Sequence, residues 1–214
     1  MPSPLDSLIE MEVQEGVDLS QHTSFAIGGP AALFVTALST TALASILTAA
    51  NKLHLDTLIL GGGTNLLVSD DGFDGLVIRL DLNRLTLDKE AGLIHVGASV
   101  KTAVLVEQLI ADGFAGLEFA AGLPGTIGGG IAGNAGCFGH TLSDYLVRAT
   151  VVDVQGAVHE IADLEWFRFQ YRHSNLLGNR MVLAEATFAV HPGDGGRLRN
   201  ESDKYLAVRA EKHP

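Results

Sequence analysis

The sequence predicts an α+β fold with two lobes, and three observations lead to this prediction. The chain has 214 residues, 47% of them hydrophobic, so it can bury a substantial core. Short apolar runs with the length or alternation of strands form two groups along the chain, each with a segment of helical periodicity. The 25 glycines are concentrated in a few segments, which mark places where the backbone turns tightly or approaches another group closely.

The first lobe is predicted over residues 21–80, after a mixed, acidic leader segment over residues 1–20 with room for one short helix. The helix of this lobe has Leu43, Ile46 and Leu47 at helical spacing, so we expect it to cover one face of a small sheet. In order, the predicted elements are a strand over 32–35, a helix over 40–52, and strands over 57–60 and 76–80.

The second lobe is predicted over residues 81–192. Its helix carries Leu105 and Leu109 at helical spacing and ends at Gly113, since helices commonly end at a glycine. The pair Gln155-Gly156 predicts a hairpin turn between two strands. In order, the predicted elements are a strand over 92–96, a helix over 100–112, strands over 147–154, 157–161 and 181–190, and, within residues 193–214, a helix over 200–211.

The composition excludes several classes of partner. The formal net charge of −11 and the lack of a basic cluster argue against nucleic acid, whose binding depends on Lys and Arg contacts to phosphate. No uninterrupted apolar run approaches the roughly 20 residues that span a bilayer, so no membrane partner is expected. The N-terminus lacks the basic and apolar regions of a secretory signal, and the single cysteine, Cys137, fits a reducing compartment. We therefore expect a cytoplasmic protein.

An acidic chain can still bind a phosphorylated ligand when backbone N–H groups hold the phosphate. The segment Gly61-Gly62-Gly63-Thr64-Asn65 follows an apolar strand. Its glycines allow consecutive N–H groups to converge on an anion, and Thr64 and Asn65 add side-chain donors. The alternative interpretation is a plain turn between two strands.

A longer glycine-dense segment runs from Gly116 to Gly136 and contains fewer bulky side chains than a core requires. Such a backbone suits close contact with a large flat ligand and its phosphates, with Thr126 and Asn134 as polar contacts.

Two common nucleotide sites are rejected for this segment. Its glycines match G-x-G-x-x-G formally, but Pro124 and Gly125 stand where the strand of a Rossmann site should end. The sequence G-K-[ST] does not occur, which excludes a Walker-type site.

A third candidate is the segment Phe169-Gln170-Tyr171-Arg172-His173-Ser174. An arginine here is suited to stabilising negative charge that develops on a carbonyl or an enolate. The alternative is a surface arginine in an ion pair, which the segment taken alone favours.

Other reactive residue types receive structural interpretations. No metal site is expected, because the eight histidines show neither H-x-x-x-H nor H-E-x-x-H spacing and one cysteine cannot complete a ligand set. Cys137 is interpreted as a small packing residue rather than a nucleophile. Ser174 has no G-x-S-x-G context, so a hydrolase is unsupported.

Five separated motifs occur in a distinctive order. They are His22-Thr23-Ser24-Phe25 with Gly28-Gly29, Gly61 to Leu67, Gly116-Leu117-Glu118-Phe119 running into Gly122 to Gly129, Asn134-Ala135-Gly136, and Tyr171-Arg172-His173-Ser174. Over about residues 20–192, this order and spacing closely resemble the UDP-N-acetylenolpyruvoylglucosamine reductases. Each motif alone is weak, and their agreement makes the resemblance specific.

The resemblance implies a two-lobed FAD-binding fold of the vanillyl-alcohol oxidase type. FAD is then expected to lie between the lobes, bound non-covalently, since no histidine or cysteine has a recognisable flavinylation context. The residues implied in cofactor contacts are Gly61, Gly62, Gly63, Thr64, Asn65, Leu66, Gly122, Pro124, Gly125, Thr126, Gly128, Gly129, Asn134 and Gly136.

The resemblance also implies a reaction. In the family, NADPH reduces the flavin, which passes hydride to the enolpyruvyl group of UDP-N-acetylglucosamine enolpyruvate and gives UDP-N-acetylmuramate for peptidoglycan synthesis. Arg172 matches the family's catalytic arginine, which stabilises the enolate. Tyr171 and Ser174 are placed to bind the UDP-sugar substrate at the same site.

Some positions depart from the family's pattern. Gly62 and Cys137-Phe138 stand where larger or different residues are usual, so altered cofactor contacts are expected. Residues 193–214 resemble the start of the family's C-terminal substrate domain, whose later part carries the proton-donating serine and a catalytic glutamate. We therefore expect a missing or separate C-terminal domain as a partner, and no substrate reduction by this chain alone.

Two alternatives remain open. One is a non-catalytic or sensory FAD-binding module. Reductase activity that appears when a C-terminal partner is added would favour a reductase over such a module. The other is a different FAD oxidoreductase of the same superfamily that acts on a small hydroxy substrate. Arg172 within Y-R-x-S favours the cell-wall enzyme over the second alternative.

Overall fold

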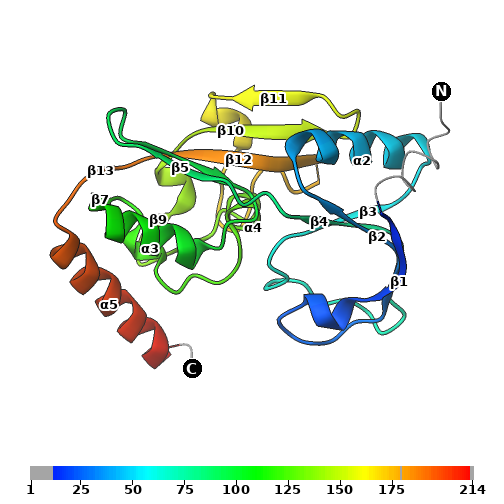
Figure 1. The fold of residues 1–214 in the computed structure, drawn as a ribbon. Helices are drawn as coiled ribbons and strands as arrows, with labels where there is room; N and C mark the ends of the chain where they lie inside the picture. Colours follow the sequence, from blue (N-terminus) through cyan, green and yellow to red (C-terminus); the bar gives the residue numbers. More distant parts are fainter. Residues whose placement is uncertain (1–11, 179, 213–214) are drawn as a thin grey trace.

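The computed structural model describes residues 12–178 and 180–212. They form two adjoining lobes, each built from a sheet and helices (Figure 1). The first sheet has the order β1-β2-β4-β3, and the second has the order β11-β10-β12-β6-β5. None of the helices in the described residues is both long and apolar enough to cross a bilayer.

The elements have the following bounds. The first sheet contains β1 (Gln14–Asp18), β2 (Pro30–Ala37), β3 (Thr57–Leu60) and β4 (Phe73–Leu80). The second contains β5 (Leu85–Asp88), β6 (Leu93–Gly97), β10 (Leu146–Asp153), β11 (Val158–Ile161) and β12 (Met181–Ala189). Two short pairs are β7 (Phe114–Ala115) with β13 (His191–Pro192), and β8 (Gly136–Cys137) with β9 (His140–Thr141). The α-helices are α2 (Thr40–Lys52), α3 (Thr102–Asp112), α4 (Ile127–Ala132) and α5 (Gly195–Lys212), and the 3-10 helices are η1 (Leu19–His22), η2 (Glu118–Ala120), η3 (Leu142–Asp144) and η4 (Leu164–Phe167).

The first sheet confirms the predicted order of strand, helix, strand and strand. The strands β2, β4 and β3 are parallel, and α2 makes the crossover from β2 to β3. The side chains of β4 alternate between two apolar clusters, because successive residues of a strand point to opposite faces. Leu76 and Ile78 face the larger cluster, and Val77 faces the smaller one.

The predicted leader segment is wrong for its second half. Residues 14–18 form β1, which pairs antiparallel with β2 at the edge of the first sheet. Four of its five residues are exposed, so the strand lacks the apolar alternation that would reveal it in the sequence. A short 3-10 helix, η1, begins at Leu19 at the end of this segment, and residues 1–11 lie outside the described residues.

The second sheet contains every strand predicted for it and one more. The sequence did not predict β5, whose pairing with β6 lies at the sheet edge. As predicted, α3 ends at Gly113, which has a left-handed φ of 73°. The last helix, α5, begins at Gly195, earlier than expected, and packs beside α3. The guanidinium of Arg199 on α5 donates two 2.7 Å bonds to the Glu107 carboxylate of α3, and this ion pair is largely exposed.

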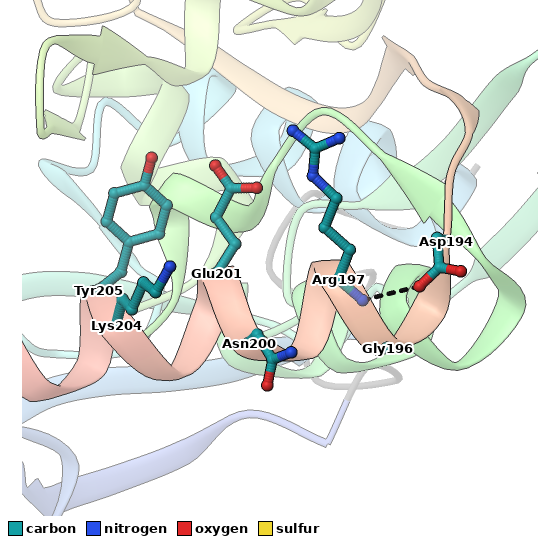
Figure 2. Close-up of a pocket in the computed structure, with 7 residues that line it drawn as sticks. All are labelled: Asp194, Gly196, Arg197, Asn200, Glu201, Lys204 and Tyr205. Atoms are coloured by element: carbon teal, nitrogen blue, oxygen red, sulfur yellow. Dashed lines mark hydrogen bonds between the residues drawn. The ribbon is translucent and has the colours of Figure 1, made fainter.

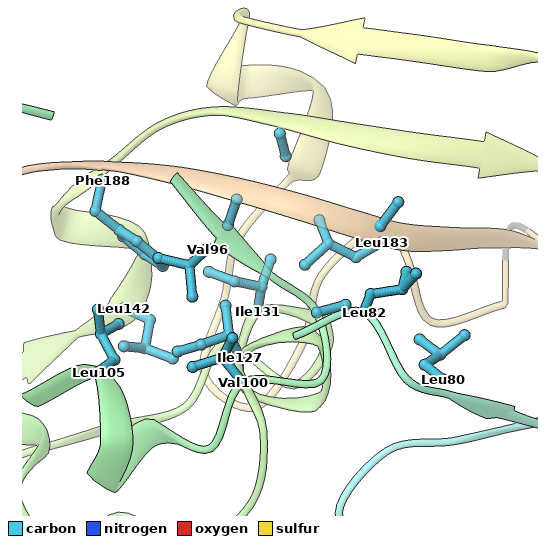
Figure 3. Close-up of a cluster of buried hydrophobic side chains, with 14 of the residues drawn as sticks. Leu80, Leu82, Val96, Val100, Leu105, Ile127, Ile131, Leu142, Leu183 and Phe188 are labelled. Atoms are coloured by element: carbon cyan, nitrogen blue, oxygen red, sulfur yellow. The ribbon is translucent and has the colours of Figure 1, made fainter. Parts of the chain in front are cut away.

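The two lobes share one apolar core. Side chains of α2 and of both sheets belong to a single buried cluster. Figure 3 shows part of it, where Val96 and Phe188 of the second sheet lie above Ile127 and Ile131 of α4. A smaller cluster fills the other face of the first sheet, and its buried members are Leu19, Ala31, Phe34, Leu60, Val68 and Val77.

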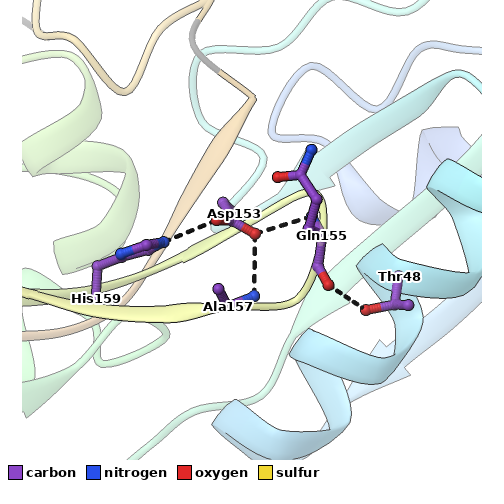
Figure 4. A network of polar contacts seen from close by, with 5 residues as sticks. All are labelled: Thr48, Asp153, Gln155, Ala157 and His159. Carbon is purple, nitrogen blue, oxygen red and sulfur yellow. Dashed lines mark hydrogen bonds and ion pairs between the residues drawn. The ribbon is translucent and has the colours of Figure 1, made fainter.

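The predicted hairpin after β10 also ties the second sheet to α2 (Figure 4). Asp153 accepts bonds from the backbone N–H groups of Gln155 and Ala157 at 2.8 and 3.0 Å and contacts His159 Nε2 at 2.7 Å. The bond with His159 is the largest cause that lowers the pKa of the Asp153 carboxyl, followed by the backbone bonds. The Gln155 carbonyl accepts a 2.9 Å bond from Thr48 Oγ1 of α2.

Candidate cofactor-binding site

The two glycine segments meet backbone to backbone where the two lobes adjoin. A Cβ placed at Gly61 would lie 2.9 Å from Thr126 Oγ1, and one at Gly62 would lie 3.1 Å from Gly125 Cα. Gly125 has a φ of +100°, and a Cβ there would lie 2.8 Å from Thr64 Oγ1. Larger side chains would push the segments apart, so glycine is required for this approach.

The loop that follows η1 joins the same place. Gly63 has a φ of +63°, and a Cβ there would collide with the His22 carbonyl oxygen at 2.0 Å. The Gly63 carbonyl accepts a 3.0 Å bond from Ser24 N. The His22 ring packs on Phe34, and burial is the main cause that lowers its pKa. The loop that contains His22 and Ser24 thus packs against the glycine run at Gly63.

Several polar groups at this junction have no partner within the described part of the chain. They include the backbone N–H groups of Gly62, Gly63, Thr64, Asn65 and Gly129, which donate to no backbone acceptor in the described residues. Thr126 Oγ1 and Asn134 Oδ1 are buried and also lack a hydrogen bond to any described residue. Buried polar atoms are nearly always hydrogen-bonded in proteins, so these two oxygens are available to a ligand that can hydrogen-bond to them.

The structure separates two glycines that the sequence analysis treated alike. Both lie in α4, a short helix that the sequence did not predict. Gly128 is buried, and a Cβ there would lie 2.9 Å from Ala98 Cβ, so its close contact is with the protein itself. Gly129 is exposed, and among the described residues outside the backbone of its own helix, only Thr126 Oγ1, at 3.8 Å, lies near its Cβ position. Of these two glycines, only Gly129 therefore leaves its backbone accessible to a ligand.

The turn that carries Arg172 is anchored to the end of α4. Asn134 Nδ2 donates to the Gln170 carbonyl at 3.1 Å, and Ser174 Oγ donates to the Ala132 carbonyl at 2.7 Å. Ser174 is fully buried, and its oxygen also accepts from Leu176 N at 3.3 Å. Its hydroxyl is thus hydrogen-bonded within the protein, and substrate binding by Ser174 stays a prediction.

The two residues at the tip of this turn point outward. Tyr171 is 94% exposed. Arg172 is exposed, has a left-handed φ of 57°, and forms no ion pair with any described residue. The surface ion pair considered for Arg172 is therefore not found within residues 12–178 and 180–212.

The remaining residues predicted to contact the cofactor differ in their exposure and in the groups that they contact. Leu66 packs against the smaller apolar cluster, and Pro124 is exposed. Gly136 belongs to the short β8–β9 hairpin, where a Cβ would lie 2.3 Å from the His140 carbonyl oxygen. Gly122 lies against the side chain of Arg209, a residue that is not among the predicted site residues. Nothing in the sequence near Arg209 could have indicated this contact.

Two further features supply none of the unpartnered groups at the junction. Cys137 is half-buried and its thiol contacts the Phe119 carbonyl at 3.1 Å, as expected for a packing residue. A groove on α5, shown in Figure 2, is lined by residues from Asp194 to Tyr205, and none of them belongs to the glycine segments. Among the described residues, no cluster of three or more His, Cys, Asp or Glu side chains could hold a metal ion.

Comparisons with known proteins agree with this geometry. Residues 31–162 match the model of an FAD-binding domain family. The UDP-N-acetylenolpyruvoylglucosamine reductase of Clostridium novyi is 31% identical over 212 residues, which are 98% of this chain and 68% of that protein. The crystal structure of the corresponding reductase from Thermus caldophilus has a TM-score of 0.77 at 28% identity and covers 92% of this chain and 69% of that one.

A more distant structure shares the fold alone. Glucooligosaccharide oxidase from Acremonium strictum has a TM-score of 0.62 at 18% identity and covers 89% of this chain and 43% of its own. The α+β fold is thus the two-lobed FAD-binding fold of the vanillyl-alcohol oxidase type. Because residues 31–162 match an FAD-binding domain and the curated reductase of Clostridium novyi is 31% identical over 98% of this chain, the chain belongs to the UDP-N-acetylenolpyruvoylglucosamine reductase family.

Proposed function

We propose that this chain binds FAD at the junction of its two lobes and serves the NADPH-dependent reduction of UDP-N-acetylglucosamine enolpyruvate to UDP-N-acetylmuramate. The observation that carries the proposal is the pair of buried, unpartnered oxygens, Thr126 Oγ1 and Asn134 Oδ1, beside a backbone cradle that only glycine permits. The cytoplasmic location expected from the sequence belongs to the same proposal and is supported by a single, unpaired cysteine.

The residues present suit a dinucleotide with a flat ring and a pyrophosphate. The N–H groups from Gly62 to Asn65, which donate to no backbone acceptor in the described residues, lie in one short loop and can bind phosphate oxygens without a cationic side chain. The open face of Gly129 gives a flat ring room to approach the backbone, with Thr126 Oγ1 beside it. When bound there, FAD supplies the chemistry of hydride transfer.

Arg172 is proposed to bind and stabilise the negative charge that develops on the enolpyruvyl group. Its planar guanidinium donates in a fork that matches a carboxylate or an enolate. Asn134 and Ser174 hold the turn that presents it, because each binds a backbone carbonyl across the contact with α4. Tyr171, exposed beside Arg172, is available to contact the UDP-sugar.

The first test is cofactor binding. We expect the purified apo-protein to bind FAD with a saturable heat signal in calorimetry, because the buried oxygens and free N–H groups gain partners. Acid denaturation is expected to release all yellow colour into the supernatant. Failure to bind FAD would contradict the proposed function, and colour retained by the precipitated protein would contradict non-covalent binding.

The second test concerns Arg172. Arg172→Lys keeps the charge but loses the planar fork, so the substrate-dependent rate is expected to fall by about 10–100-fold. Flavin reduction by NADPH should be unchanged. The assay follows NADPH oxidation without oxygen, with and without the enolpyruvyl substrate, for the chain alone and mixed with the C-terminal domain of a complete relative.

The matched control is Arg168→Lys, since Arg168 is also exposed and has a similar left-handed φ of 46°. It is expected to retain the wild-type rate. Equal rates for the two variants would remove Arg172 from the reaction. A wild-type protein without substrate-dependent oxidation in either arrangement would contradict the proposed reaction.

A further inference from the structure

The side chain of Arg209 in α5 packs against Gly122 of the glycine-dense segment. Gly122 has a φ of +70°, and a Cβ there would lie 2.9 Å from Arg209 Cδ and 3.2 Å from its Nε. One guanidinium nitrogen, Nη2, contacts Cys137 Sγ at 3.1 Å, and the group stands 5.8 Å from the centre of the Phe138 ring. A glycine at 122 thus makes room for this side chain beside the proposed FAD site.

The positive charge of Arg209 lacks a counter-charge within the described residues. Its Nε is buried without a hydrogen-bond partner there, and no described carboxylate oxygen lies within ion-pair distance. Burial raises the pKa of the Cys137 thiol, so the sulfur beside the guanidinium is neutral at pH 7. By contrast, Arg199 on the same helix is paired with Glu107 through two bonds of 2.7 Å.

A partly buried cation without a counter-charge is unfavourable unless a ligand supplies one. Arginine binds the oxygens of a phosphate with two parallel bonds, and it remains charged at every physiological pH. Gly122, which it touches, belongs to the same glycine-dense segment as Thr126 and Asn134, the residues with unpartnered oxygens among the described residues. The groove on α5 is a weaker candidate for an anion, because the charges of its basic residues, Arg197 and Lys204, are balanced by acidic Asp194 and Glu201.

We propose that Arg209 binds a pyrophosphate oxygen of a nucleotide ligand and thereby links α5 to the cofactor site. The inference rests on the proposed function, because the junction must receive a nucleotide. Two ligands carry this chemistry, the dinucleotide cofactor and the nucleoside diphosphate of the substrate. In both cases the ligand supplies the negative charge that Arg209 lacks in the protein.

The experiment compares Arg209→Gln, Arg209→Lys and the control Arg199→Gln, which removes a charge from the exposed ion pair of the same helix. Calorimetry measures the Kd of FAD for the apo-protein and the Kd of UDP for the FAD-loaded protein. For one of these ligands, Arg209→Gln is expected to raise the Kd by about 10–100-fold, as for a lost charge-assisted hydrogen bond. Arg209→Lys should raise the same Kd by at least about fivefold, and Arg199→Gln by less than about twofold.

The outcomes separate the sources of the anion. A weaker FAD complex assigns Arg209 to the cofactor pyrophosphate, and weaker UDP binding with normal FAD binding assigns it to the substrate diphosphate. Unchanged Kd values for both ligands overturn the inference and leave the proposed function intact. A wild-type protein that binds neither ligand overturns both. If Arg209→Gln gives no cooperative melting transition, Arg209→Lys decides, and an unchanged Kd for that variant overturns the inference.

Discussion

Replacing Gly129 with valine is expected to raise the Kd of FAD at least about 100-fold while the protein remains folded. Gly129 is exposed in α4, and its Cβ position is open except for Thr126 Oγ1 at 3.8 Å. A branched side chain there would occupy the space where a flat ring approaches the backbone and would cover the free N–H group. The loss would come from steric exclusion rather than from unfolding.

Calorimetric titration of FAD measures this effect, and thermal melting of the apo-protein checks the fold. Gly133→Val is the matched control, because a Cβ at Gly133 meets only the Gly129 carbonyl oxygen at an ordinary 3.5 Å. It adds the same β-branched residue to the other end of α4 and is expected to retain FAD. An unchanged Kd for Gly129→Val would remove this face of α4 from the cofactor site.

Replacing Gly63 with alanine is expected to lower the free energy of unfolding by roughly 3–5 kcal/mol. The added Cβ would lie 2.0 Å from the His22 carbonyl oxygen and 3.0 Å from Thr23 Cα. Both atoms belong to backbone, so no side-chain rotation relieves the collision. The glycine loop would have to separate from the loop after η1, which also breaks the bond from Ser24 N to the Gly63 carbonyl.

Urea denaturation followed by circular dichroism measures this loss against Gly16→Ala. Gly16 has nearly the same φ, +65° against +63°, but no atom lies within 4 Å of its Cβ position. The control is expected to cost only about 1–2 kcal/mol, from the left-handed conformation. Equal losses for the two variants would show that the close approach at Gly63 contributes nothing beyond backbone strain.

The regular elements were predictable where their own residues carried the periodicity. The helix α2 has the predicted bounds, since Leu43, Ile46 and Leu47 are buried at helical spacing. Likewise, β3 was predicted over the residues that form it. By contrast, β1 is mostly exposed and depends on pairing with β2, so its own sequence does not indicate a strand.

The site was predictable in composition but not in arrangement. Glycine density and the five ordered motifs indicated a cofactor that contacts backbone, and the FAD-binding family match agrees. The sequence could not distinguish Gly128 from Gly129, because their different surroundings depend on Ala98, which is distant in the chain. It could not place the Ser174 hydroxyl either, since its acceptor is the Ala132 carbonyl.

By itself, the sequence determined the two-lobed fold, the family and the segments that we propose as ligand contacts, because these depend on local periodicity and on residue types such as glycine. Only the tertiary structure decided which atoms remain free for that ligand. Among the described residues, Thr126 Oγ1, Asn134 Oδ1 and Arg209 Nε are left without hydrogen-bond partners only after every neighbouring segment has taken its place. Whether a polar atom is satisfied depends on contacts between residues far apart in the chain, and local sequence does not encode those contacts.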